Sequence, residues 1–300
     1  MAQENSYLQK ASLDVIFSFP DFRPQHFCTQ YYHYTFAKGK EGIVHGKELE
    51  FLMSKTTDFL DRNEGTSILE PYYHACGHLY ETGKIDSEFF LIARSITAQM
   101  LRNHVADLWA LCLTPHGCSS FMKERYAPND GWILSFTSDA LAELWLAFPK
   151  KYGRFERIQI QYSFKIMKRR LESILKRIFN AYKKDSKAQV PNLREEVTKL
   201  LLRIVYFYGL RYKGRDYKEE KEVRLLLRLE KNVRPFIWTS KVKNLEVRFS
   251  NNGGEESVHL ILGSPYFYQA TQEMSLYNDE RLNSPSLTSE TIQKVLSEKK

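Results

Sequence analysis

The run from Lys213 to Leu229, KGRDYKEEKEVRLLLRL, constrains the fold most, because a charged segment leads directly into an apolar one. The apolar end has the length and composition of a buried strand. Side chains alternate between the two faces of a strand, so Glu220, Glu222 and Arg224 are predicted to share one face. Such a set is typical of an edge strand with a solvated charged face, or of a functional site where the chain enters the core.

The composition favours a protein with a substantial core and a local basic patch. Of the 300 residues, 43% are hydrophobic and 14% are aromatic. The net charge is +8, and residues 151–187 alone carry 12 Lys and Arg against 3 Asp and Glu. This patch fits an anionic partner such as nucleic acid, a phosphate-bearing cofactor or an acidic membrane surface. The alternative is a helix whose exposed face is simply rich in Lys and Arg.

The cysteines and the apolar runs indicate the compartment. Cys28, Cys76, Cys112 and Cys118 have unrelated spacings and no C-x-x-C pair, which argues against a zinc ribbon or a disulfide scaffold. No apolar run is long enough for a transmembrane segment, and the N-terminus lacks a signal peptide. We expect a cytoplasmic protein, or one delivered into a host cell by a specialised secretion system.

Periodicity predicts the secondary structure. Apolar and alternating runs predict strands near residues 30–35, 108–113, 131–136, 158–162, 221–230, 245–249 and 257–262. Residues three and four apart predict helices at 69–82, 86–104, 140–148, 164–184 and 192–210.

These elements predict one α+β domain over residues 28–282, with a central mixed, mostly antiparallel sheet flanked by helices. A helical insertion is expected at 67–104, and the basic helix at 164–184 belongs to the same domain. Residues 1–27 are expected to form an N-terminal arm, and residues 283–300 a C-terminal helix or tail.

Two short segments suggest chemistry. In a strand, His33 and Thr35 face one side together, which favours the lip of a pocket, although a structural histidine is the alternative. On a helix, His74 and His78 share a face while Cys76 points elsewhere, so we predict no metal site there. The sequence contains neither of the glycine-rich phosphate-binding motifs G-x-x-x-x-G-K-[ST] and G-x-G-x-x-G.

Several segments between about residues 30 and 265 resemble, in order, the motifs of a bacterial family labelled domain of unknown function two-nine-seven-one. They are Tyr32 to Thr35, Ser54 to Glu64, Cys112 to Thr114, Met122 to Gly131, the set Lys213, Tyr217, Glu220, Glu222 and Arg224, and Leu260 to Gly263. The chain departs from the family where it has Phe36, Lys123 and Leu60-Asp61-Arg62.

The order of a strand His-x-Thr, a central Tyr and a late strand Glu is similar to ADP-ribosyltransferases of the His-Tyr-Glu kind, which have a split two-sheet core. The resemblance implies an NAD-dependent ADP-ribosyltransferase, a glycosyltransferase with NAD as its substrate and a protein or nucleic acid as its acceptor. Such an enzyme would be a bacterial toxin, a defence protein or a secreted effector.

The resemblance also implies roles for single residues. His33, Tyr34 and Thr35 would bind NAD, Tyr126 would stack on nicotinamide, and Glu222 would stabilise an oxocarbenium-like transition state.

Glu220 would orient the acceptor, and Arg224 would steady Glu222 or contact phosphate. Four further residues would line the pocket without a metal ion: Asp61, Glu64, Lys213 and Tyr217.

Two other functions are open. One is a nucleic-acid-binding protein or metal-dependent nuclease that uses residues 151–187, with carboxylates as ligands for a hard cation. Those carboxylates are Asp61, Glu64, Glu220 and Glu222. The other is a non-catalytic interaction module that presents the tyrosine-rich helices at 69–82 and 86–104 to a partner.

Overall fold

The computed structural model describes residues 6–8, 30–45, 48–56, 65–103, 108–117, 119–129, 131–241, 245–263 and 266–269. The predicted N-terminal arm, except for residues 6–8, and the predicted C-terminal helix or tail at 283–300 lie outside these ranges. The fold is α+β, as predicted, with an antiparallel sheet and flanking helices. The chain divides into two compact units, which we describe separately. Unit 1 comprises residues 1–23, 59–106 and 160–218, and unit 2 comprises residues 24–58, 107–159 and 219–300. The assignment of residues 28–282 to one domain stays a prediction.

Unit 1 is helical. Its helices are α3 (Leu69–Glu81), α4 (Ser87–Arg94), α5 (Ala98–Arg102), α8 (Phe164–Lys187) and α9 (Leu193–Gly209). The segment predicted as one helix over 86–104 is two helices, because the Thr97 side chain caps α5 by accepting a hydrogen bond from the Met100 N–H.

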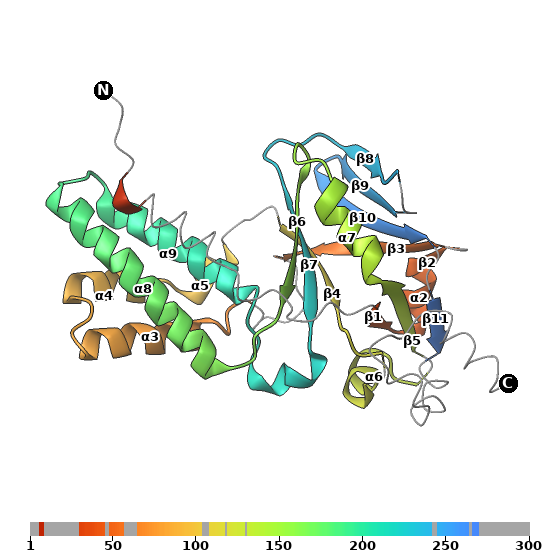
Figure 1. The fold of residues 1–300 in the computed structure, drawn as a ribbon, viewed down its shortest axis with the longest axis horizontal. Helices are drawn as coiled ribbons and strands as arrows, with labels where there is room; N and C mark the ends of the chain where they lie inside the picture. Colours follow the sequence, from red (N-terminus) through yellow and green to blue (C-terminus); the bar gives the residue numbers. More distant parts are fainter. Residues whose placement is uncertain are drawn as a thin grey trace. The chain divides into compact units, whose positions relative to one another are not determined.

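The long helix α8 organises unit 1. Its apolar residues recur at three- and four-residue spacings, so they form one buried stripe. This stripe includes Met167, Leu171, Ile174, Leu175 and Ile178. The helix packs against α3 and α9, and Figure 1 shows α8 and α9 running side by side.

Asp185, near the end of α8, is buried and holds the described N-terminal residues. Its two carboxylate oxygens accept hydrogen bonds from the backbone N–H groups of Tyr7 and Leu8, each at 2.9 Å. These bonds satisfy a carboxylate that would otherwise be buried without partners.

Unit 2 holds the strands. They are β1 (Gln30–Thr35), β2 (Val44–His45), β3 (Glu48–Lys55), β4 (Leu108–Leu113), β5 (Trp132–Thr137), β6 (Gly153–Gln159), β7 (Val223–Leu229), β8 (Phe236–Thr239), β9 (Leu245–Asn252), β10 (Glu255–Gly263) and β11 (Tyr266–Gln269). Among the described residues of unit 2, the α-helices are α2 (Ala37–Ile43), α6 (Ser120–Tyr126) and α7 (Ser138–Ala147).

The strands form two antiparallel sheets. The larger has the order β6-β7-β4-β3-β10-β9-β8, with β2 beside β3, and the smaller has the order β1-β5-β11 (Figure 1). Tyr32 of β1 and Thr114 after β4 exchange two backbone hydrogen bonds, of 2.9 and 3.0 Å. At this point β1 therefore lies beside β4, which in turn pairs with β7.

The prediction of a strand over residues 158–162 is wrong in its bounds. β6 starts at Gly153, because residues 153–159 pair with β7, and it ends at Gln159. Gln161 makes only an isolated bridge, with Tyr212. The alternating I-Q-I-Q-Y pattern marks where side chains are buried but not where the partner strand ends.

The core of unit 2 lies on one face of the larger sheet. It collects the odd-numbered residues of β7, from Val223 to Leu229, together with Phe51, Leu111 and Tyr31. A smaller cluster on the other face of β1 contains Tyr32, Tyr34, Ala127 and Ile133. Among the described residues no helix is long and apolar enough to cross a membrane.

Candidate functional site

The E-x-E-x-R segment is not one continuous strand. Glu220 is the last residue of a 3₁₀ helix, η3 (Arg215–Glu220), and Lys221 has a left-handed φ of 44°. The strand β7 begins only at Val223. Glu222 and Arg224 share a face, as predicted, but placing Glu220 in the same row is wrong. A left-handed Lys is uncommon, and strand periodicity alone gives no sign of such a turn.

Glu222 and Arg224 form a buried ion pair. Only 4% of Glu222 is exposed and none of Arg224, and the Arg224 Nε–H donates to Glu222 Oε1. Burial lowers the pKa of Arg224 to about 9, so the guanidinium remains positive at neutral pH. Each of the two buried charges is therefore balanced by its partner in the pair.

Glu220 is held by the helix α6. The Tyr126 hydroxyl donates a hydrogen bond of 2.5 Å to Glu220 Oε1, and only 2% of Glu220 is exposed. A Cβ on Gly131 would lie 2.4 Å from the Ala127 backbone, so the turn after α6 is closely packed. Two segments that are 94 residues apart in the sequence thus meet through this hydrogen bond.

Tyr34 ties β1 to the start of α6. Its hydroxyl donates to the His116 carbonyl at 3.0 Å and accepts from the Ser119 N–H at 3.1 Å. Tyr34 shares its face of β1 with Tyr32 and packs in the same small cluster as Ala127. The segments Tyr32 to Thr35, Cys112 to Thr114 and Met122 to Gly131 are therefore in direct contact.

His33 lies on the opposite face of β1. Its Nδ1 is 3.1 Å from the Cys112 carbonyl, to which it donates in the Nδ1–H tautomer, and its ring meets Phe51 edge-on. Burial lowers the pKa of His33, and the bond to Cys112 partly opposes this shift. These contacts are those of a histidine that closes the junction between the two sheets.

The strand register keeps His33 and Thr35 away from Glu222. The Tyr32–Thr114 bridge sets the register of β1 against β4, which pairs with β7. Because side chains alternate between the two faces of a strand, His33 faces the core side together with Val223. Glu222, the residue before Val223, faces the opposite side. Thr35 is buried with its Oγ1 only 2.1 Å from where a Cβ of Gly39 would be. The structure thus joins Tyr126 to Glu220 and Glu222 to Arg224, but it does not bring His33 or Thr35 to them.

The other predicted pocket residues are Lys213, Tyr217, Asp61 and Glu64. Lys213 and Tyr217 belong to unit 1, where the Lys213 Nζ is 5.4 Å from the centroid of the Tyr217 ring. Asp61 and Glu64 lie outside the described residues.

His116, whose neighbours Cys118, Ser119 and Ser120 lack the pattern of a nucleophilic site, interacts electrostatically with the residues that flank Glu220. It is partly buried, and burial together with the positive charge of Lys221 lowers its pKa, whereas Glu219 opposes the shift. His116 follows the Cys112-Leu-Thr motif by two residues, and this proximity is the one sequence signal that points to it.

The His74, Cys76 and His78 segment has other partners. His74 packs edge-on against Phe164, and the His78 Nδ1 lies 2.8 Å from a Glu172 oxygen. Burial raises the pKa of Cys76 to about 12, which disfavours the thiolate that binds metals. Within the described ranges, no group of three or more His, Cys, Asp or Glu side chains could hold a metal ion.

The basic helix has a coherent exposed face. Lys165, Arg169, Lys176 and Lys187 are exposed and, at about 100° per residue, fall within an arc of about 40°. In the part of the chain that the structure describes, none of these four pairs with a carboxylate, whereas the nearby Lys183 binds Asp86 at 3.1 Å. We call these four residues the basic stripe.

Comparisons with protein-family models, with curated proteins and with solved structures found no match to this chain. The family resemblance and the roles that it implies stay predictions.

Proposed function

We propose that unit 2 is an ADP-ribosyltransferase-like catalytic unit that uses NAD as its substrate, with its chemistry at Glu220, Glu222 and Tyr126. The hydrogen bond from Tyr126 to Glu220 carries this proposal, because it joins the two motifs to which the resemblance assigns stacking and catalysis. His33 and Thr35 have no part in the site in this form of the proposal, because they face the core.

The chemistry follows from the charges. When the bond between C1′ of the ribose and N1 of nicotinamide breaks, positive charge develops on the ribose, and a fixed carboxylate stabilises that charge. Glu222, oriented by Arg224, supplies this carboxylate. Glu220 then takes the proton of the acceptor group as that group bonds to C1′, and Tyr126 fixes its orientation.

The test uses labelled NAD and the full-length chain. Wild-type protein should release nicotinamide and transfer label in a cell lysate, and Glu222→Gln should lower both by at least about a hundredfold. Glu219→Gln, an exposed neighbour, is the matched control. Because Glu222→Gln leaves a buried guanidinium, its folding is checked by circular dichroism, and binding of NAD to the wild type is measured separately by NMR.

Two results would refute this function. One is a wild-type protein that neither binds NAD nor releases nicotinamide. The other is a folded Glu222→Gln variant that labels the lysate as well as the wild type.

The basic stripe favours a second function, the binding of a nucleic acid. The helix α8 has 24 residues and is therefore about 36 Å long, so its stripe can follow a phosphate backbone. Neutralising several phosphates releases counterions, which makes affinity fall steeply with salt.

The triple variant Lys165→Glu, Arg169→Glu and Lys176→Glu should abolish binding of a labelled DNA or RNA duplex in a filter assay. The control carries the same charge change at three exposed residues that are not part of α8: Lys84, Lys231 and Arg234. Wild-type affinity without a salt dependence, or equal losses in both triple variants, would eliminate this function.

A further inference from the structure

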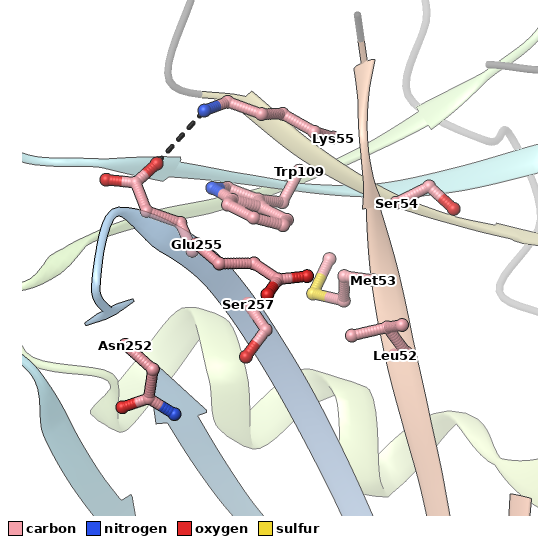
Figure 2. Close-up of a pocket in the computed structure, with 9 residues that line it drawn as sticks. Leu52, Met53, Ser54, Lys55, Trp109, Asn252, Glu255 and Ser257 are labelled. Atoms are coloured by element: carbon pink, nitrogen blue, oxygen red, sulfur yellow. Dashed lines mark hydrogen bonds and ion pairs between the residues drawn. The ribbon is translucent and has the colours of Figure 1, made fainter. Parts of the chain in front are cut away.

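A pocket opens where β3 changes its partner. β3 pairs with β10 over residues 48–53 and with β4 at Ser54 and Lys55. The partners diverge at this point and leave a pocket of about 350 Å³, within the size range of small-molecule sites. Figure 2 shows its lining residues, which are Leu52, Met53, Ser54, Lys55, Trp109, Asn252, Glu255, Glu256 and Ser257.

The floor of the pocket contains an unsatisfied donor. Trp109 is only 4% exposed, and its Nε1–H has no hydrogen-bond partner among the described residues. The nitrogen end of the indole lies on the side of the pocket where Lys55 forms its ion pair (Figure 2). A buried N–H without an acceptor is unfavourable, so a ligand with an acceptor oxygen would gain from binding here.

The chain itself places a cation in this pocket. The Lys55 Nζ is 3.0 Å from Glu256 Oε2 and 5.5 Å from the centroid of the Trp109 ring. An ammonium between a carboxylate and an indole face has two favourable electrostatic partners. Glu255 adds a second carboxylate, so acids outnumber bases in the lining.

The ion pair over Trp109 is exchangeable. The Lys55 and Glu256 side chains are 25% and 32% exposed, and an exposed pair of this kind contributes little to stability. A competing cation can therefore replace Lys55 at the Glu256 carboxylate, beside the indole of Trp109.

We propose that this pocket binds a small organic cation, an ammonium or guanidinium compound with a nearby carbonyl oxygen, which takes the place of Lys55. The cation binds Glu256 over the Trp109 ring, and the carbonyl accepts the hydrogen bond of Trp109 Nε1–H. The site is independent of the proposed transferase chemistry. Cys112 on β4 pairs with Arg224, and Trp109 lies three residues before Cys112, roughly 10 Å along the strand.

The test titrates the full-length chain with four probes, followed by tryptophan fluorescence and calorimetry. Lysine amide and arginine amide carry both groups, n-butylamine has only the cation, and propionamide has only the carbonyl. We expect the two amides of basic amino acids to bind most tightly, n-butylamine more weakly and propionamide not at all.

Three variants assign the contacts. Glu256→Gln should weaken lysine amide by at least about tenfold, Lys55→Met should strengthen it, and Trp109→Phe should reduce it to the affinity of n-butylamine. Glu48→Gln, an exposed carboxylate at the other end of β3, should change nothing. Lys55 and Glu256 are partly exposed, so their variants remain informative if Trp109→Phe does not fold.

Three results would overturn the proposal. The first is the absence of binding by every probe at millimolar concentration. The second is unchanged affinity in a folded Glu256→Gln variant, and the third is propionamide binding as tightly as lysine amide.

Discussion

At the scale of single residues, the buried pair of Glu222 and Arg224 has a large energetic consequence when either partner is removed. Losing one partner leaves the other charge buried, which costs about 3–5 kcal/mol, whereas replacing both by apolar side chains of similar size is nearly neutral. We therefore predict that Glu222→Leu and Arg224→Met each lower the free energy of unfolding by that amount, and that the double variant recovers most of it.

Denaturant titrations of the four proteins give the coupling energy of this pair. The exposed pair of Lys199 and Glu195, which are 2.7 Å apart, is the control and should show almost no coupling, because solvent screens it. Additive losses at Glu222 and Arg224 would contradict the prediction.

Tyr126 provides the second prediction at this scale. Tyr126→Phe removes the hydroxyl that donates to the buried Glu220, and it should lower the free energy of unfolding by about 1.5–3 kcal/mol. Tyr152→Phe is the matched control in the same unit, because the Tyr152 ring stacks on Phe236 and its hydroxyl makes no hydrogen bond within the described part of the chain. Equal effects of the two changes would show that the bond to Glu220 contributes nothing.

At the scale of secondary structure elements, the turn between α6 and β5 depends on a glycine. A Cβ at Gly131 would lie 2.4 Å from the Ala127 backbone, whereas a Cβ at Gly42 in α2 would meet nothing within 4 Å. Gly131→Ala should therefore destabilise unit 2 by about 1–3 kcal/mol.

Gly42→Ala, by contrast, should be neutral or stabilise unit 2 by up to about 1 kcal/mol, since alanine favours helix. Thermal unfolding measures both changes. A Gly131→Ala protein as stable as the wild type would mean that this turn can widen without cost, and that Tyr126 is not fixed by it.

At the scale of the whole molecule, two histidines make stability depend on pH. Burial lowers the pKa of both His33 and His116. As pH falls below about 6.5, the unfolded chain takes up these protons before the folded chain does, so the free energy of unfolding decreases. We predict that the double variant His33→Gln and His116→Gln loses less stability between about pH 7.5 and about pH 5.5 than the wild type.

Denaturant titrations at several pH values test this prediction. His45→Gln, which changes an exposed histidine, should retain the wild-type pH dependence. If the double variant and the wild type lose stability equally, neither imidazole is the source of the effect.

The sequence by itself determined the elements whose pattern is local. The position of β7, the shared face of Glu222 and Arg224, and the long amphipathic helix α8 all follow from periods of two or 3.6 residues in adjacent side chains.

The tertiary structure decided which distant side chains meet, because such contacts depend on pairings between segments far apart in the sequence. The bridge between Tyr32 and Thr114 places His33 on the core-facing side of β1, away from Glu222, and the left-handed Lys221 turns Glu220 out of the strand to meet Tyr126. The pocket at Trp109 likewise exists because β3 leaves one partner for another, a change that no local periodicity encodes.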